Sequence, residues 1–291
     1  MEDLDRSPKS SSKWVTSEEM DDFNIKVILQ NTQEFFGTED LPVPENISPI
    51  IWNHEKAPPG RISKTTRQFF AYLEDAMDSR FPPYEETTVI DFAVFLLGML
   101  DYDDGDGRRL LHTRKEMPFY MEDGRVDVKA DATVIERQTS RFYQYILLVH
   151  ENKCFRFASG VDPEAQLIAQ AIGAFQRNNR IRKRAKISEL KSQTFPAITM
   201  FGTAVTFYKI TITEELAMAV ESDIFPAETI VHAFVPLPLP RYIDQGMGPL
   251  ENRRFVLQCF EAFKQFMGRV APPLSRRRTR VSGWQTAYEM A

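Results

Sequence analysis

A carboxylate and a lysine stand two residues apart at the end of an apolar run, as Glu151 and Lys153 after residues 146–149. An apolar run that stops on charged residues is typical of a buried strand whose far end emerges at a polar site. Because side chains alternate along a strand, we expect Glu151 and Lys153 on one face, which also carries Leu147 and Val149. Charges are costly to hold at the end of a central strand unless they have a role, so this pair is the first candidate for chemistry.

A second acid, Asp131, lies in the stretch 126–134, where apolar and polar residues alternate with the period of a strand. Carboxylates that converge on one point suit Mg²⁺, with Mn²⁺ as an alternative ion, because Mg²⁺ takes few protein oxygens and keeps waters for its substrate. Such an ion polarises a phosphodiester and lowers the pKa of an attacking water. We therefore expect Asp131 and Glu151 to hold the metal and Lys153 to orient the water or offset charge in the transition state.

These residues need a sheet and covering helices to bring them together. A broad apolar face predicts a helix over residues 84–102, and Asp162 followed by Pro163 predicts the start of another at residues 163–178. Period-two or short apolar runs predict strands at residues 109–114, 126–134, 143–153, 196–200, 206–212 and 229–235. Shorter helices are expected at residues 214–220 and 252–267. The sequence thus predicts an α/β (α+β) fold, with a mixed central sheet of about four to six strands flanked by helices in the order α-β-β-β-α-β.

The chain outside this core is less regular. Polar residues 1–20 are predicted to be disordered. Two helices are expected before the core, over residues 19–36 and 63–80, joined by a Pro-rich connector over residues 37–59. We therefore divide the chain into a tail, an N-terminal helical segment with the connector, a core domain and a basic C-terminal tail, with the bounds 1–20, 21–83, 84–270 and 271–291.

Asp131 followed by the E-x-K of Glu151 and Lys153 resembles the signature of the PD-(D/E)XK nuclease superfamily, although Ala130 stands where the signature has Pro. The segments LLVHENK, DPEAQLIAQAIGAFQRNN, ITMFGTAVTFYKITIT and ENRRFVLQCFEAFKQF are similar to a group of uncharacterised fungal proteins assigned to that fold, over roughly residues 84–267. His150 precedes the motif where similar sequences tend to carry Gln.

The resemblance implies a restriction-endonuclease-like core and metal-dependent cleavage of DNA or RNA. It also implies supporting roles for Gln166, in the helix after the motif, and for an acid of the first core helix. That acid is Glu86, with Glu85 as a close alternative.

Other interpretations stay open. Asp131 can be the polar face of a half-exposed strand, and Glu151 with Lys153 can form a same-face ion pair worth under ~1 kcal/mol at a surface. Because nuclease folds also persist as binding or regulatory modules, a catalytically silent module that binds nucleic acid or a protein is the alternative function.

A basic segment follows the helix at residues 163–178. It predicts contacts with a phosphate backbone, with a solvated charge run as the alternative. Its members are Arg177, Arg180, Arg182, Lys183, Arg184 and Lys186.

The composition of the chain narrows the classes of protein to which it can belong. The chain has 291 residues, a net charge of -5 and a pI near 5.6, so nucleic-acid binding would have to use local patches. The two cysteines, Cys154 and Cys259, show neither a disulfide framework nor a zinc site, and no run is long enough to span a membrane. Because the polar N-terminus is no secretory signal, an intracellular location in nucleus or cytoplasm is expected.

Several familiar sites are missing from the sequence. Residues 101–107 (DYDDGDG) lack the Glu that completes a calcium loop, and the histidines show no zinc-ligand spacing. No phosphate-binding loop and no nucleophile elbow occur, which argues against a nucleotide cofactor and a Ser-His-Asp hydrolase. The sequence leaves a homodimer open.

Overall fold

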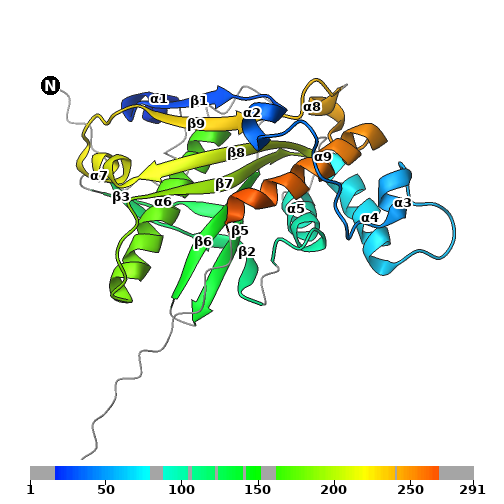
Figure 1. The fold of residues 1–291 in the computed structure, drawn as a ribbon, viewed down its shortest axis with the longest axis horizontal. Coiled ribbons are helices and arrows are strands. Elements are labelled where there is room, and N and C mark those ends of the chain that lie inside the picture. The colour runs from blue at the N-terminus through cyan, green and yellow to red at the C-terminus, as the bar shows by residue number, and fades with distance from the viewer. Residues whose placement is uncertain are drawn as a thin grey trace, which may run out of the picture.

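The computed structural model describes residues 17–78, 88–103, 107–121, 124–139, 142–151, 162–239 and 241–268. In this part of the chain one mixed sheet of seven strands runs in the order β1-β9-β8-β7-β6-β5-β2 (Figure 1). Its strands are β1 (Ile25–Leu29), β2 (Arg109–Glu116), β5 (Lys129–Thr139), β6 (Phe142–Glu151), β7 (Ser192–Phe201), β8 (Ala204–Thr213) and β9 (Thr229–Phe234). A separate ribbon consists of β3 (Phe119–Met121) and β4 (Gly124–Val126).

Helices flank both faces of the sheet, which confirms the predicted α/β class. Helices α6, α1 and α7 lie on one face, and α5, α9, α4 and α3 lie on the other (Figure 1). The helices are α1 (Ser17–Asp22), α2 (Thr32–Phe36), α3 (Pro49–Asn53), α4 (Lys64–Asp78), α5 (Thr88–Met99), α6 (Pro163–Arg184), α7 (Glu214–Ser222), α8 (Tyr242–Gln245) and α9 (Leu250–Phe263), and a 3-10 turn, η1 (Lys264–Met267), follows. None of these helices could span a membrane, within the residues that the structure describes.

The strands that carry the candidate residues, β5 and β6, are neighbouring interior strands of this sheet. Strands β2, β5 and β6 form an antiparallel meander, and β6 then pairs in parallel with β7. A parallel pair requires a crossover connection, which α6 supplies across one face. His150 pairs with Thr199 and Glu151 with Met200, so the end of β6 lies beside β7.

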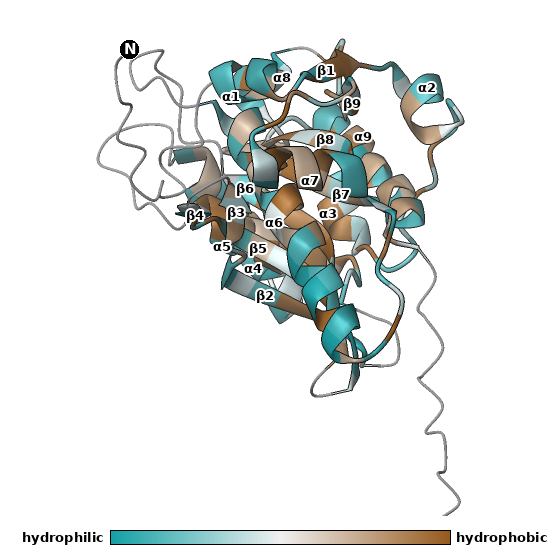
Figure 2. Ribbon diagram, turned by 90° about the vertical axis from the view of Figure 1, so that its left-hand side faces the viewer, coloured by the Kyte–Doolittle hydropathy of each residue, from teal (hydrophilic) through white to brown (hydrophobic). Residues whose placement is uncertain are grey.

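Two apolar cores result from the alternation of side chains. On β6, Leu147 and Val149 belong to the core under α5 and α9, and Leu148 belongs to the core under α6. The α6 helix buries its first half and ends in hydrophilic turns (Figure 2).

The prediction of four to six strands was too low, and the predicted helix over residues 19–36 is wrong. Residues Ile25 to Leu29 form β1, which pairs in parallel with β9, so the N-terminal segment and the core share one sheet. Ile25 and Val27 are β-branched and alternate with Lys26, a pattern that favours a strand over a helix. Asn31 then starts α2 with a capping box that includes Glu34.

Helix α6 extends beyond its predicted end at residue 178. Asn178 does not stop the helix, because its side chain accepts a hydrogen bond from Tyr145 N (2.9 Å) and donates one to Tyr145 O (3.0 Å). The added turns end in Arg182, Lys183 and Arg184, and cations at a helix C-terminus are favoured by the helix dipole.

Candidate functional site

The described part of the chain contains some of the predicted site residues. Asp131 lies on β5, Gln166 lies in the first turn of α6, and the backbone of Glu151 ends β6. Lys153 and Glu86 lie outside the described residues, and so does the side chain of Glu151.

Asp131 contacts a residue that the sequence did not single out. Its Oδ2 lies 2.9 Å from Nδ1 of His150, and the two side chains are 28% and 12% exposed. Ala132 pairs with Val149 in the antiparallel register, so Asp131 and His150 stand opposite each other on one face. The Nε2 of Gln170 lies 3.2 Å from the same Nδ1, which links this pair to α6.

This geometry determines which face of the sheet carries Asp131. Asp131, His150 and Gln170 meet between the sheet and α6, whereas Leu147 and Val149 pack in the opposite core. The sequence assigned Glu151 to the Leu147 and Val149 face. A metal shared by the two acids therefore requires the Glu151 carboxylate to reach Asp131 around the end of the sheet.

A second polar group lies under the first turn of α6. The Tyr208 hydroxyl on β8 donates to Oε1 of Glu164 at 2.9 Å, and Thr199 Oγ1 on β7 lies 3.5 Å from that hydroxyl. Tyr208 and Thr199 are 4% and 6% exposed. Burial is the main cause that raises the pKa of Glu164, and burial together with the nearby Glu164 carboxylate raises that of Tyr208.

The described donors can be compared with what Mg²⁺ needs. Mg²⁺ prefers carboxylate oxygens, and the partly exposed Asp131 supplies one. No cluster of three or more His, Cys, Asp or Glu that could hold a metal occurs among the described residues. Of the two predicted metal ligands, Asp131 is the one whose side chain the structure describes, and its carboxylate oxygens are of the kind that Mg²⁺ prefers.

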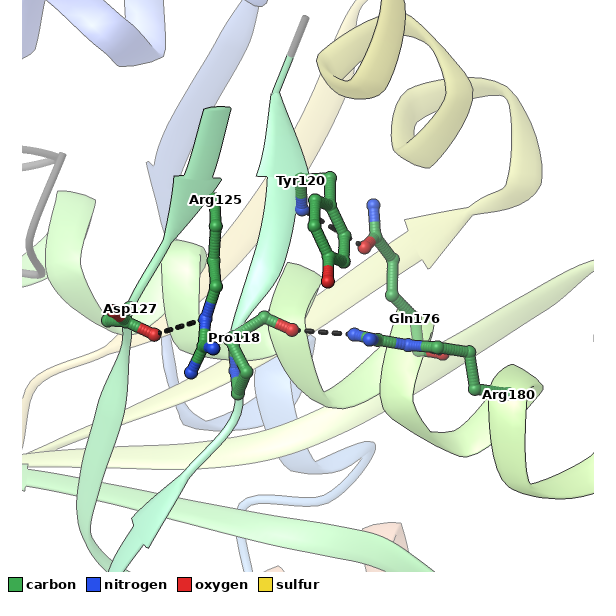
Figure 3. A network of polar contacts seen from close by, with 6 residues as sticks. All are labelled: Pro118, Tyr120, Arg125, Asp127, Gln176 and Arg180. Atoms are coloured by element: carbon green, nitrogen blue, oxygen red, sulfur yellow. Dashed lines mark hydrogen bonds and ion pairs between the residues drawn. The ribbon is translucent and has the colours of Figure 1, made fainter. Parts of the chain in front are cut away.

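Two arginines of the basic segment, Arg177 and Arg180, contact other elements of the fold. Arg180 donates to Pro118 O at 2.6 Å and its guanidinium lies 5.5 Å from the ring centre of Tyr120, while Gln176 accepts from Tyr120 N (Figure 3). Arg177 donates to the Tyr143 hydroxyl at 3.3 Å. These contacts fasten the β3–β4 ribbon and β6 to α6, which explains why these two arginines are half-buried.

The rest of the basic segment faces solvent to a greater extent. Arg182 donates to Ser188 O at 2.7 Å, and Lys183 lies 3.8 Å from Glu189. Lys183, Arg184 and Lys186 are exposed. Of the six predicted phosphate contacts, these three are the residues best placed to meet a ligand.

Comparison with known proteins gives no relative to guide the assignment. No model of a known protein family matches the chain, and no curated protein matches it. We therefore draw its function from the residues and their geometry.

Proposed function

We propose that the protein hydrolyses phosphodiesters of DNA or RNA with the help of Mg²⁺ or Mn²⁺. The observation that carries the proposal is the position of Asp131, a partly exposed carboxylate on β5 beside the end of β6, where Glu151 begins the E-x-K motif. The order α5, β2, β5, β6, α6, β7, with an antiparallel meander and a parallel fourth strand, supports it. That order is the one implied by the resemblance to PD-(D/E)XK nucleases.

In this proposal the residues of the chain have separate tasks. Asp131 and Glu151 hold the metal, Lys153 orients the attacking water, and Gln166 and Glu86 support the site. His150 fixes the orientation of the Asp131 carboxylate through its contact of 2.9 Å, and Gln170 holds His150 through a contact of 3.2 Å. The metal, when bound, would polarise the phosphodiester and acidify the water.

Cleavage assays test this proposal directly. Labelled single- and double-stranded DNA and RNA are incubated with wild type, Asp131→Asn and Lys153→Ala, in Mg²⁺ and in EDTA. We expect wild type to cleave in Mg²⁺ only, and each variant to lose about 10²-fold or more in rate while its thermal unfolding stays close to that of wild type. Asp127→Asn is the matched control, because this exposed aspartate pairs with Arg125 away from His150. The absence of both cleavage and Mg²⁺ binding by calorimetry in wild type would refute the proposal.

A second candidate is a catalytically silent module of the same fold. It is favoured by the close pairing of Asp131 with His150, and by the packing of Leu147 and Val149 on the opposite face. Such a module would bind its partner equally well in EDTA and after Asp131→Ala.

In either candidate, binding of nucleic acid would use the exposed end of α6. The plot of the logarithm of the association constant for nucleic acid against the logarithm of salt concentration has a negative slope. Replacing Lys183, Arg184 and Lys186 by Ala is expected to reduce the magnitude of this slope by about 2–3, since each phosphate contact contributes about 0.9. The control replaces exposed Lys56, Arg61 and Lys64 near α4. An equal effect of both triple variants would mean that α6 carries no specific role in binding.

A further inference from the structure

The face of the sheet under α6 carries a row of polar side chains that the proposed mechanism uses only in part. Asp131 on β5 contacts His150 on β6, and His150 pairs in register with Thr199 on β7. Thr199 contacts Tyr208 on β8, and Tyr208 bonds to Glu164 of α6. The row thus crosses four neighbouring strands at the end of the sheet where β6 stops and Glu151 lies.

The hydrogen bonds that Thr199 and Tyr208 donate lead to the carboxyl group of Glu164. Thr199 can donate to the Tyr208 oxygen, and the Tyr208 hydroxyl donates to Glu164 Oε1. A phenol and a hydroxyl that are 4% and 6% exposed therefore direct their protons toward one half-buried acid. Such an arrangement stabilises the carboxylate after it has given up a proton, because the donors are already in place.

The start of α6 does not need the hydrogen bond between Glu164 and Tyr208 as a cap. The start of α6 is already capped, since Asp162 accepts a hydrogen bond from Glu164 N at 2.9 Å. Burial is the main cause that raises the pKa of the Glu164 carboxyl group; the hydrogen bond from Tyr208 lowers this pKa, the nearby Asp162 raises it, and the net shift is upward. A carboxyl of this kind keeps its proton to higher pH than an exposed one, as a general acid must.

We propose that Glu164 is the general acid of the proposed hydrolysis and that Tyr208 is its positioning residue. This inference rests on the proposed function and goes beyond it, because it assigns the group that protonates the leaving oxygen. Water attacks phosphorus, the bond from phosphorus to the leaving oxygen breaks, and that oxygen takes the electron pair. The Glu164 carboxyl gives its proton to this oxygen, the attacking water releases a proton to solvent, and the Tyr208 hydroxyl bonds the new carboxylate.

Two substrates that differ in the leaving group test the assignment. One is an oligonucleotide, whose sugar alkoxide needs a proton, and the other is thymidine 5′-(p-nitrophenyl phosphate), whose phenolate leaves without one. We expect Glu164→Gln to slow the oligonucleotide reaction about 10²-fold or more and the ester reaction less than about threefold. Tyr208→Phe should slow the oligonucleotide reaction about tenfold, with the same contrast between substrates.

The control is Glu215→Gln, which removes an exposed acid from the first turn of α7 and should change neither rate. Equal losses on both substrates, or no loss, would show that Glu164 is not the acid while leaving hydrolysis itself intact. A wild type that cleaves neither substrate would overturn hydrolysis and the acid together. If Glu164→Gln fails to fold, the contrast between substrates in Tyr208→Phe decides the question.

Discussion

Helices α5 and α6 cover opposite faces of the sheet, and the layers that they bury differ in kind. On the α5 side, the ring of Phe207 lies against Phe260 and Phe263, with centroids 5.1 and 5.0 Å away, and against Phe36 and Phe234. On the α6 side, the sheet carries a row of polar side chains. In this row Asp131 contacts His150, and Thr199, Tyr208 and Glu164 are joined by hydrogen bonds. Aromatic burial stabilises without fixing atoms to a point, whereas hydrogen bonds hold atoms at set positions, so the α6 side is the one suited to chemistry.

The two helices also differ in how closely they approach the rest of the fold. A Cβ added to Gly173 of α6 would lie 2.1 Å from Met117 O, a backbone atom before the β3–β4 ribbon, whereas one added to Gly98 of α5 would meet nothing within 4 Å. The α6 helix therefore approaches its neighbours closely at Gly173, whereas α5 leaves open space at Gly98.

The largest effect is expected from the aromatic layer. Phe207→Ala removes a fully buried ring and should lower the free energy of unfolding by about 3–5 kcal/mol, because it leaves a cavity that its neighbours cannot fill. Urea denaturation followed by circular dichroism measures the loss. Phe225→Ala is the control, since that side chain is 69% exposed and should change stability by less than about 0.5 kcal/mol. A loss below about 1 kcal/mol for Phe207→Ala would contradict the close packing of the aromatic layer around this ring.

A smaller effect separates the two helices. Gly173→Ala should destabilise the protein by about 1–3 kcal/mol, because contact with the Met117 carbonyl outweighs the gain in helix propensity. Gly98→Ala should instead stabilise it by about 0.5–1 kcal/mol, since the helix gains propensity without a clash. Thermal unfolding of the two variants checks the signs, and a stabilising Gly173→Ala would remove the contrast.

The smallest effect concerns pH. The pKa of Glu164 is raised from its ordinary value of 4.5, chiefly by burial, so the folded state keeps this proton to higher pH than the unfolded state. Relative to Glu164→Gln, wild type should be most stable below pH 4.5 and should lose that advantage as pH rises through the raised pKa. Urea denaturation of both proteins across this window measures the difference, and a difference that is constant with pH contradicts the raised pKa.

The sequence predicted what depends on local pattern. The start of α6 followed from Asp162 and Pro163, and the alternation in residues 126–134 correctly placed Asp131 on a strand. These signals are local, since a cap or a period of two acts within a few residues.

Local sequence patterns could not predict which side chains contact one another in the candidate site. Tyr208 and Glu164 are 44 residues apart in the chain, and Gln170 and His150 are 20 apart. Which side chains meet depends on the register between strands and on the height of α6, neither of which is written in one segment. The same reason explains the missed strand β1, whose partner β9 lies about two hundred residues later.

The pairing of β1 with β9 has a consequence for synthesis. During synthesis, β1 cannot complete its pairing in the sheet until residue 234 has been made, because β9 is its partner. The buried Arg253 of α9 extends this delay, since its guanidinium donates to the carbonyls of Ile51, His54 and Glu55. The N-terminal quarter of the chain is thus completed by its C-terminal quarter. A truncation that ends before β9 would leave the first strand without its partner, and one that ends before α9 would leave the connector without its contacts to Arg253.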